Sequence, residues 1–280
     1  MLNYINVSVK VPDSLAEMAI AYISLFDTEG IEERQNELVI CFREENWNAG
    51  VKSQLSEILA SIDEQIIITE EMKVAEQNWN EQWEKEVPVV IVNNNIGIAP
   101  SSKLNQLNTA VKIEINPKMS FGTGTHASTR LMCRMEEKYV RPGATWLDAG
   151  CGTGVLAILA AMLGAGKLIA FDNNEWAIMN SKENFLLNNV ENKIELHDWD
   201  LDEMELPQSD GILANLNLGI VLNSIPKFYK SLADAKGILI VSGILYDDFD
   251  EVAGVAAANG FRHVETAGDE EWISIVFRAE

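Results

Sequence analysis

The chain has 280 residues, a length that favours two domains, and 47% of them are hydrophobic, enough for a sizeable core. Its 43 acidic residues outnumber the 21 basic ones, so the formal charge is -22 at pH 7. Such a charge repels phosphate backbones and argues against DNA as a ligand; it either favours a cationic partner or only keeps the protein soluble.

Cysteine and histidine residues are few. The three cysteines are odd in number and widely spaced, and the three histidines have no ligand-like spacing relative to them. We therefore expect neither a disulfide framework nor a structural metal. The first residues show no leader pattern and no apolar run is long enough to span a bilayer, so we expect a location in the reducing cytoplasm.

Residues 1–72 predict a small α+β domain. Apolar residues alternate over 5–11 as in a half-buried strand, and an amphipathic helix follows Pro12. Two short strands, a second amphipathic helix from Val51 and a strand ending at Ile68 complete the pattern. This order of elements is that of a ferredoxin-like domain. It contains no cluster of reactive side chains, so we interpret it as a substrate-recognition domain.

Residues 73–88 predict a helical linker. Trp79 and Trp83 lie four residues apart and would share one face of the helix. We interpret this pair as filling an interdomain contact, with ligand binding as the alternative. Pro88 ends the helical pattern.

Residues 89–280 predict an α/β domain. Strands and a helix up to Tyr139 lead into an alternation of strands and helices, which implies a doubly wound parallel sheet covered on both faces. Two final strand patterns, Phe261–Ala267 and Trp272–Phe277, are joined by a hairpin-like connection, which adds an antiparallel strand. The strands expected before them are Trp146–Leu147, Leu168–Phe171, Ile194–Leu196, Ile212–Leu213 and Ile238–Val241.

A glycine-rich turn follows the first strand of the alternation. Its sequence is Asp148-Ala149-Gly150-Cys151-Gly152-Thr153-Gly154, and a helical pattern begins directly after it. Ligands of parallel sheets bind at the carboxyl ends of the strands, and glycines let them approach the backbone closely. The turn therefore predicts a ligand site, with a tight strand-helix turn that binds nothing as the alternative.

Asp172 ends the next strand, 22 residues after Gly150. A carboxylate at this point can accept hydrogen bonds from both ribose hydroxyls of a nucleoside. The alternative is that Asp172 caps the following helix, a role that Asn173 or Asn174 could also serve. Together the glycine loop and the acid indicate an adenosine-containing cofactor.

These motifs also carry a family resemblance. The turn at Asp148–Gly154 resembles the first motif of class I S-adenosylmethionine-dependent methyltransferases. The stretch Phe-Gly-Thr-Gly-Thr-His at 121–126 resembles the cofactor-covering loop of the ribosomal protein L11 methyltransferases. Ala214-Asn215-Leu216 resembles the asparagine motif of that family, and Ser242–Leu245 and Glu271-Trp272 its C-terminal pattern. The likeness extends over nearly the whole chain.

The resemblance implies a class I methyltransferase domain that binds S-adenosylmethionine and methylates ribosomal protein L11, a basic protein, on lysine side chains and the N-terminal amine. The residues that it implies for cofactor binding are Phe121, Gly122, Thr123, Gly124, Thr129, Asp148, Gly150, Gly152, Gly154, Asp172 and Asn215. The first four would form part of a lid. Asn116 and Lys118 depart from the family pattern, which usually has an acidic residue and a glycine there.

Elementary chemistry is consistent with these roles. The glycines and threonines at 122–125 suit a mobile flap, or else a plain surface loop. The Asn215 amide could orient the lone pair of a substrate amine, which makes it the one catalytic residue we assign, although a buried turn-former is the alternative. His126 and His197 are expected to be structural. Asp198 or Trp199 is expected to border the adenine.

Methyl transfer from a sulfonium needs alignment of amine, methyl and sulfur more than an activated nucleophile. Desolvation would favour the neutral amine, and the proton would leave to solvent. Two rival functions stay open: a methyltransferase of the same class acting on RNA or glutamine, and a non-enzymatic nucleotide-binding module. The chain has no basic stripe for RNA, and it has Asn215–Leu218 where glutamine-modifying enzymes favour Asn-Pro-Pro-Tyr. We expect a monomer.

Overall fold

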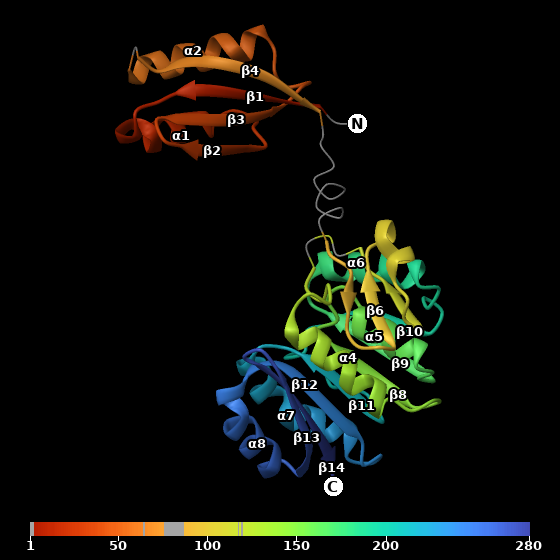
Figure 1. Ribbon diagram of the computed structural model, residues 1–280. Coiled ribbons are helices and arrows are strands. Elements are labelled where there is room, and N and C mark those ends of the chain that lie inside the picture. Colours follow the sequence, from red (N-terminus) through yellow and green to blue (C-terminus); the bar gives the residue numbers. More distant parts are fainter. Residues whose placement is uncertain (1–2, 64, 76–86, 117, 119) are drawn as a thin grey trace. The chain divides into compact units, whose positions relative to one another are not determined.

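A computed structural model describes residues 3–63, 65–75, 87–116, 118 and 120–280. The chain divides into two compact units, Met1–Trp79 and Asn80–Glu280 (Figure 1). Residues 73–75, which we assigned to a helical linker, belong instead to a strand, because the last strand of the first unit continues to Ala75. Most of the predicted linker, including both tryptophans, lies outside the described residues.

The first unit is a four-stranded antiparallel sheet with two helices. Its strands are in the order β2-β3-β1-β4, and every neighbouring pair is antiparallel. Val7 and Val9, on one face of β1, belong to the same buried cluster as Leu55 and Leu59 of α2. This arrangement confirms the ferredoxin-like prediction. The elements are β1 (Asn3–Lys10), η1 (Asp13–Leu15), α1 (Ala16–Ile23), β2 (Gly30–Arg34), β3 (Glu37–Arg43), α2 (Ala49–Ile62) and β4 (Ile67–Ala75).

The second unit opens with a small three-stranded sheet. Its strands are in the order β5-β6-β7, with β6 antiparallel to β5 and parallel to β7. Its elements are β5 (Val90–Ile91), β6 (Ile96–Ala99), η2 (Ser101–Gln106) and β7 (Val111–Glu114).

A seven-stranded sheet forms the rest of the second unit. The strand order is β10-β9-β8-β11-β12-β14-β13, and β14 alone among these strands runs opposite to the others. The doubly wound, mostly parallel sheet with an antiparallel strand is thus confirmed. The elements are α4 (Ala127–Tyr139), β8 (Thr145–Ala149), α5 (Val155–Met162), β9 (Lys167–Asp172), α6 (Glu175–Leu187), β10 (Ile194–Asp198), β11 (Gly211–Asn215), α7 (Leu218–Leu232), β12 (Ile238–Leu245), η3 (Tyr246–Asp248), α8 (Phe249–Ala258), β13 (Phe261–Asp269) and β14 (Trp272–Ala279).

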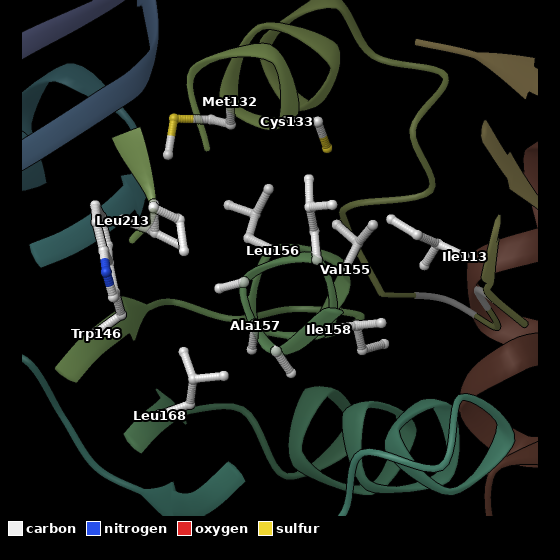
Figure 2. Close-up of a cluster of buried hydrophobic side chains, with 14 of the residues drawn as sticks. Ile113, Met132, Cys133, Trp146, Val155, Leu156, Ala157, Ile158, Leu168 and Leu213 are labelled. Carbon is white, nitrogen blue, oxygen red and sulfur yellow. The ribbon is translucent and has the colours of Figure 1, made fainter. Parts of the chain in front are cut away.

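Hydrophobic cores lie on both faces of this sheet because successive strand residues point to opposite sides. On β8, Trp146 joins the cluster that contains Leu156 of α5 and Met132 of α4 (Figure 2). The next residue, Leu147, joins the opposite cluster, in which strand residues pack with residues of α7 and α8. Within the ranges that the structure describes, no helix has the length and apolar character needed to cross a membrane.

The topology brings three loop regions together. Strand β8 lies between β9 and β11, so the chain continues to one side of β8 and later returns to the other. This is a topological switch point, where open α/β sheets bind ligands beyond the carboxyl ends of the strands. The glycine loop after β8 is thereby flanked by Asp172 at the end of β9 and Asn215 at the end of β11.

Candidate functional site

A cavity of about 850 Å³ opens at this edge of the sheet. That volume is within the usual range for small-molecule sites. Six of the residues predicted to bind or border the cofactor line it: Phe121, Gly150, Gly152, Asp172, Trp199 and Asn215. The other residues predicted to bind cofactor do not line it in this structure: Gly122, Thr123, Gly124, Thr129, Asp148 and Gly154.

The glycine loop needs its three glycines for both conformation and space. All three have positive φ, at +70° for Gly150, +54° for Gly152 and +80° for Gly154. A Cβ on Gly152 would lie 2.4 Å from the backbone oxygen of Phe121. One on Gly154 would lie 2.4 Å from Cε1 of Phe185. The loop is therefore enclosed by neighbouring segments and at the same time exposes backbone to the cavity.

The predicted lid is anchored on this loop. The Thr153 backbone N–H donates to the Phe121 carbonyl at 2.9 Å, and its hydroxyl donates to the Gly122 carbonyl at 2.7 Å. Gly124 packs so closely on β6 that a Cβ would lie 2.7 Å from Cδ1 of Ile98. The side chain of Phe121 is 54% exposed and lines the cavity. The start of the lid is thus held by its backbone, while its aromatic ring borders the cavity.

The end of the lid leads into α4 through His126. Its Nδ1 accepts a hydrogen bond from the Ser128 backbone N–H at 3.3 Å and so caps the helix. The imidazole also contacts the Trp272 ring edge-on, with centroids 4.6 Å apart. Within the lid, the hydroxyls of Thr123 and Thr125 lie 2.7 Å apart. His126 therefore has the structural contacts expected of a histidine at a helix start.

Asp172 connects the glycine loop to the next helix. Its Oδ2 accepts from the Gly152 N–H at 3.0 Å, and its Oδ1 accepts from the Asn174 N–H at 3.0 Å. The N-cap of α6 is Asn174, whose side chain accepts from two backbone N–H groups of the first turn. Asp172 is therefore not the helix cap that we considered as its alternative role. Its carboxylate stands at the cavity and fixes the loop beside it.

Asn215 ends β11 on the other side of the glycine loop. Its Oδ1 is buried and has no hydrogen-bond partner among the described residues, although the residue lines the cavity. A buried acceptor without a partner is destabilising unless a ligand or water supplies a donor. This atom is thus suited to receive an N–H or O–H group from a bound molecule.

Asp148 lies beneath the loop instead of lining the cavity. It is fully buried, and its Oδ2 accepts from the Ala157 N–H in the first turn of α5 at 3.0 Å. The pKa of Asp148 is raised to about 7: burial raises it most, the hydrogen bond from Ala157 lowers it, and the charge of Asp172 raises it by a smaller amount. Asp148 therefore acts on the site by holding the start of α5.

Trp199, just after β10, forms part of the cavity wall and stacks on His197 of that strand. The rings of His197 and Trp199 are stacked, with centroids 3.8 Å apart and planes 9° apart. The backbone N–H of Trp199 donates to the backbone carbonyl of Asp172 at 3.2 Å, which connects this part of the cavity wall to the end of β9. Trp199 lines the cavity, whereas Asp198 is exposed and does not. Of the two residues expected near an adenine, the structure brings only Trp199 to the cavity.

Sequence reasoning missed an asparagine face on α6, formed by Asn180, Asn184 and Asn188. The Asn184 side chain donates to the Thr153 carbonyl at 2.9 Å and accepts from the Asn116 N–H at 3.0 Å. It thereby joins the glycine loop to the segment that precedes the lid. The sequence signal was an asparagine at every fourth position of a predicted helix. This spacing places the asparagine side chains on one face of the helix.

Lys118, one of the departures from the family pattern, has an unusual backbone conformation. Lys118 has φ +44°, in the left-handed region that favours glycine. Its ammonium forms an ion pair with Glu183 of α6. The lysine therefore holds a conformation that favours glycine and makes a charged contact with α6.

We expect Asn188→Ala to lower the free energy of unfolding by about 2 kcal/mol. The Asn188 side chain accepts from the Glu114 N–H at 2.9 Å and donates to the Glu114 carbonyl at 2.7 Å, so its loss leaves two backbone groups without partners. Urea denaturation measures the change. Asn192→Ala is the control, since that exposed side chain bonds only to its neighbour Glu191. Equal stability of the two variants would contradict the role given to Asn188.

Comparisons with known proteins show which family the chain resembles. The family model described as "Ribosomal protein L11 methyltransferase" matches residues 4–280. A protein of that name from Chlorobaculum parvum is 33% identical over 281 residues, covering 97% of this chain and 95% of the relative. One from Chlorobaculum tepidum is 32% identical, with the same coverage. The solved structure of a ribosomal protein L11 methylase from Lactobacillus delbrueckii subsp. bulgaricus is 27% identical, with a TM-score of 0.62, over 69% of this chain and 99% of that one. The chain therefore belongs to the ribosomal protein L11 methyltransferase family.

Proposed function

We propose that this protein transfers methyl groups from S-adenosylmethionine to amino groups of ribosomal protein L11, on lysine side chains and the N-terminal amine. The observation that carries the proposal is one cavity bordered by the glycine loop, Asp172 and Asn215, at the ends of three neighbouring strands. Membership of the family supports the reaction, and the names of the relatives support the substrate.

The residues of the cavity fit the cofactor. Gly150 and Gly152 offer backbone with no Cβ in the way, which suits the methionine part. The Asp172 carboxylate can accept from ribose hydroxyls, and Trp199 offers a flat apolar surface for the adenine. We also propose Thr129 as a cofactor-binding residue, because its hydroxyl is buried with no partner among the described residues.

We assign the remaining predicted cofactor residues supporting roles. Asp148 and Gly154 hold the start of α5 and its packing on α6. Phe121 closes one side of the cavity, and the rest of the lid fixes its backbone. The other predicted residues of this lid are Gly122, Thr123 and Gly124.

S-adenosylmethionine supplies a methyl group that is already activated on a positively charged sulfur. The protein has to desolvate and orient the amine. Asn215 Oδ1 accepts a hydrogen bond from the amine and directs its lone pair, an effect of orientation. Desolvation favours the neutral amine. Because His126 Nδ1 is engaged at the start of α4, we assign proton loss to solvent.

The charge of -22 would speed encounter with a basic protein substrate. We propose a cytoplasmic monomer that binds neither DNA nor membranes, with the first unit recognising the substrate. The decisive experiment is incubation with labelled S-adenosylmethionine, purified L11 and, separately, ribosomal RNA, followed by mass spectrometry. Label on lysine and N-terminal amines of L11 is expected. Label on glutamine or RNA, or none on any substrate, would refute the proposal.

We expect Asn215→Ala to lower the rate of methyl transfer to L11 by about 10- to 100-fold, because the amine loses the acceptor that orients it. Single-turnover kinetics at saturating cofactor separate this loss from weaker cofactor binding. Asp198→Asn is the control, since that exposed carboxylate lies at the end of the adjacent strand β10 but does not line the cavity. A rate within twofold of wild type for Asn215→Ala would remove its catalytic assignment.

A further inference from the structure

Asn180 is a second cavity residue with an unused acceptor. It lies on α6, is 1% exposed and lines the cavity. Its Nδ2 donates to the backbone carbonyl of Asn116 at 2.8 Å. Its Oδ1 is buried and has no hydrogen-bond partner among the described residues.

The orientation of the Asn180 amide follows from its neighbour. A carbonyl oxygen can only accept, so the NH₂ end of the side chain must face the Asn116 carbonyl. The opposite orientation would place two oxygens against each other. Asn116 is itself held by the hydrogen bond from its N–H to Asn184, so the carbonyl cannot easily turn away. The free atom of Asn180 is therefore an acceptor, and it requires a donor.

The position of Asn180 in the cavity indicates which side of a bound molecule would supply that donor. Among the described residues, the buried polar atoms without partners include two from cavity residues, Oδ1 of Asn180 and Oδ1 of Asn215. They come from elements on opposite sides of β8, since α6 follows β9 and Asn215 ends β11. Next to Asn180, Ser181 packs on the glycine loop, where a Cβ on Gly154 would lie 3.1 Å from its Cβ. Asn180 thus belongs to the Asp172 side of the cavity, away from the proposed amine-orienting residue.

We propose that Asn180 binds the cofactor, with Oδ1 accepting a hydrogen bond from a donor of the adenosyl ligand. This inference rests on the proposed function. The proposed function assigns the adenine, with its amino group, to Trp199. Two kinds of donor are then left for Asn180: the ribose hydroxyls and the ammonium of the methionine part. Both give the same chemistry, an O–H or N–H group directed at a neutral amide oxygen.

Calorimetry with S-adenosylhomocysteine and donor-deleted analogues tests the proposal. Asn180→Ala is expected to weaken binding of S-adenosylhomocysteine about tenfold, the usual effect of one neutral hydrogen bond. The tenfold effect should disappear for every analogue that lacks the partner group. The analogues are methylthioadenosine, which has no ammonium, and its 2′-deoxy and 3′-deoxy forms, each without one ribose hydroxyl. Loss of the effect for all three analogues identifies the ammonium as the donor, and loss for only one deoxy form identifies the hydroxyl that this form lacks.

Asn184→Ala is the matched control. That asparagine has both amide atoms bonded inside the protein, so its loss should weaken all ligands by the same factor. If Asn180→Ala also weakens all ligands equally, or weakens none, the inference is overturned. Asn180→Ser, whose hydroxyl still accepts, is measured as well in case Asn180→Ala does not fold. Wild-type protein that binds no adenosyl ligand would overturn the proposed function and this inference together.

Discussion

Gly152→Ala is expected to abolish detectable binding of S-adenosylhomocysteine, a loss of about a thousandfold or more. The new Cβ would lie 2.4 Å from the backbone oxygen of Phe121, a distance that no rotamer change can relieve. Either the loop or the lid must move, which breaks the hydrogen bond between the Thr153 N–H and Phe121. Together with the left-handed φ of +54°, the distortion costs about 4 kcal/mol. Calorimetry measures the binding, and circular dichroism checks the fold.

Gly143→Ala separates conformational strain from the close contact. Gly143 also has positive φ, at +81°, but a Cβ there would meet nothing within 4 Å. We expect this variant to lose about 1 kcal/mol of stability and to bind S-adenosylhomocysteine like the wild type. If a folded Gly152→Ala protein bound the ligand within tenfold of wild type, the close fit between lid and glycine loop would not be needed for binding.

Asp148→Asn is expected to change the pH dependence of stability. The pKa of Asp148 is raised from 3.8 to about 7 in the folded state, chiefly by burial. Between pH 4 and about 7 the folded protein keeps a proton on Asp148, whereas the unfolded chain has released it. The stability that Asp148 contributes is therefore fully present below pH 4 and is lost as the pH rises to about 7. The loss amounts to about 4 kcal/mol. Asparagine resembles the protonated acid and can still accept from Ala157, so the variant should lack this loss.

Urea denaturation of ligand-free protein between pH 4 and pH 8 tests this expectation. The free energy of unfolding of Asp148→Asn should rise relative to wild type across the interval. Glu136→Gln serves as a second variant, because burial and the nearby Asp148 charge also raise the pKa of Glu136 well above its ordinary value. Each variant should remove the part of the pH dependence of stability that comes from the carboxyl group it replaces. Parallel profiles for wild type and Asp148→Asn would show that Asp148 is not held protonated in the fold.

The amino-acid sequence by itself determined the two-part fold class, the positions of the strands that alternate with helices in the second unit, and the glycine loop of the candidate cavity. These features follow from local information: apolar periodicity sets strand or helix, and glycines mark turns with positive φ. Asp172 and Asn215 could be found for the same reason, since a polar residue that ends a buried strand is visible without tertiary contacts.

Tertiary structure alone decided how these parts meet. It inserted β14 between β12 and β13 and brought Asn184 against Thr153 and Asn116. It also placed Asp148 beneath the loop, away from the cavity that the motif had suggested. Each of these features is a contact between segments far apart in the chain, and residue spacing does not specify which distant partner a side chain meets. The role of a polar side chain in this site is therefore set by what packs around it.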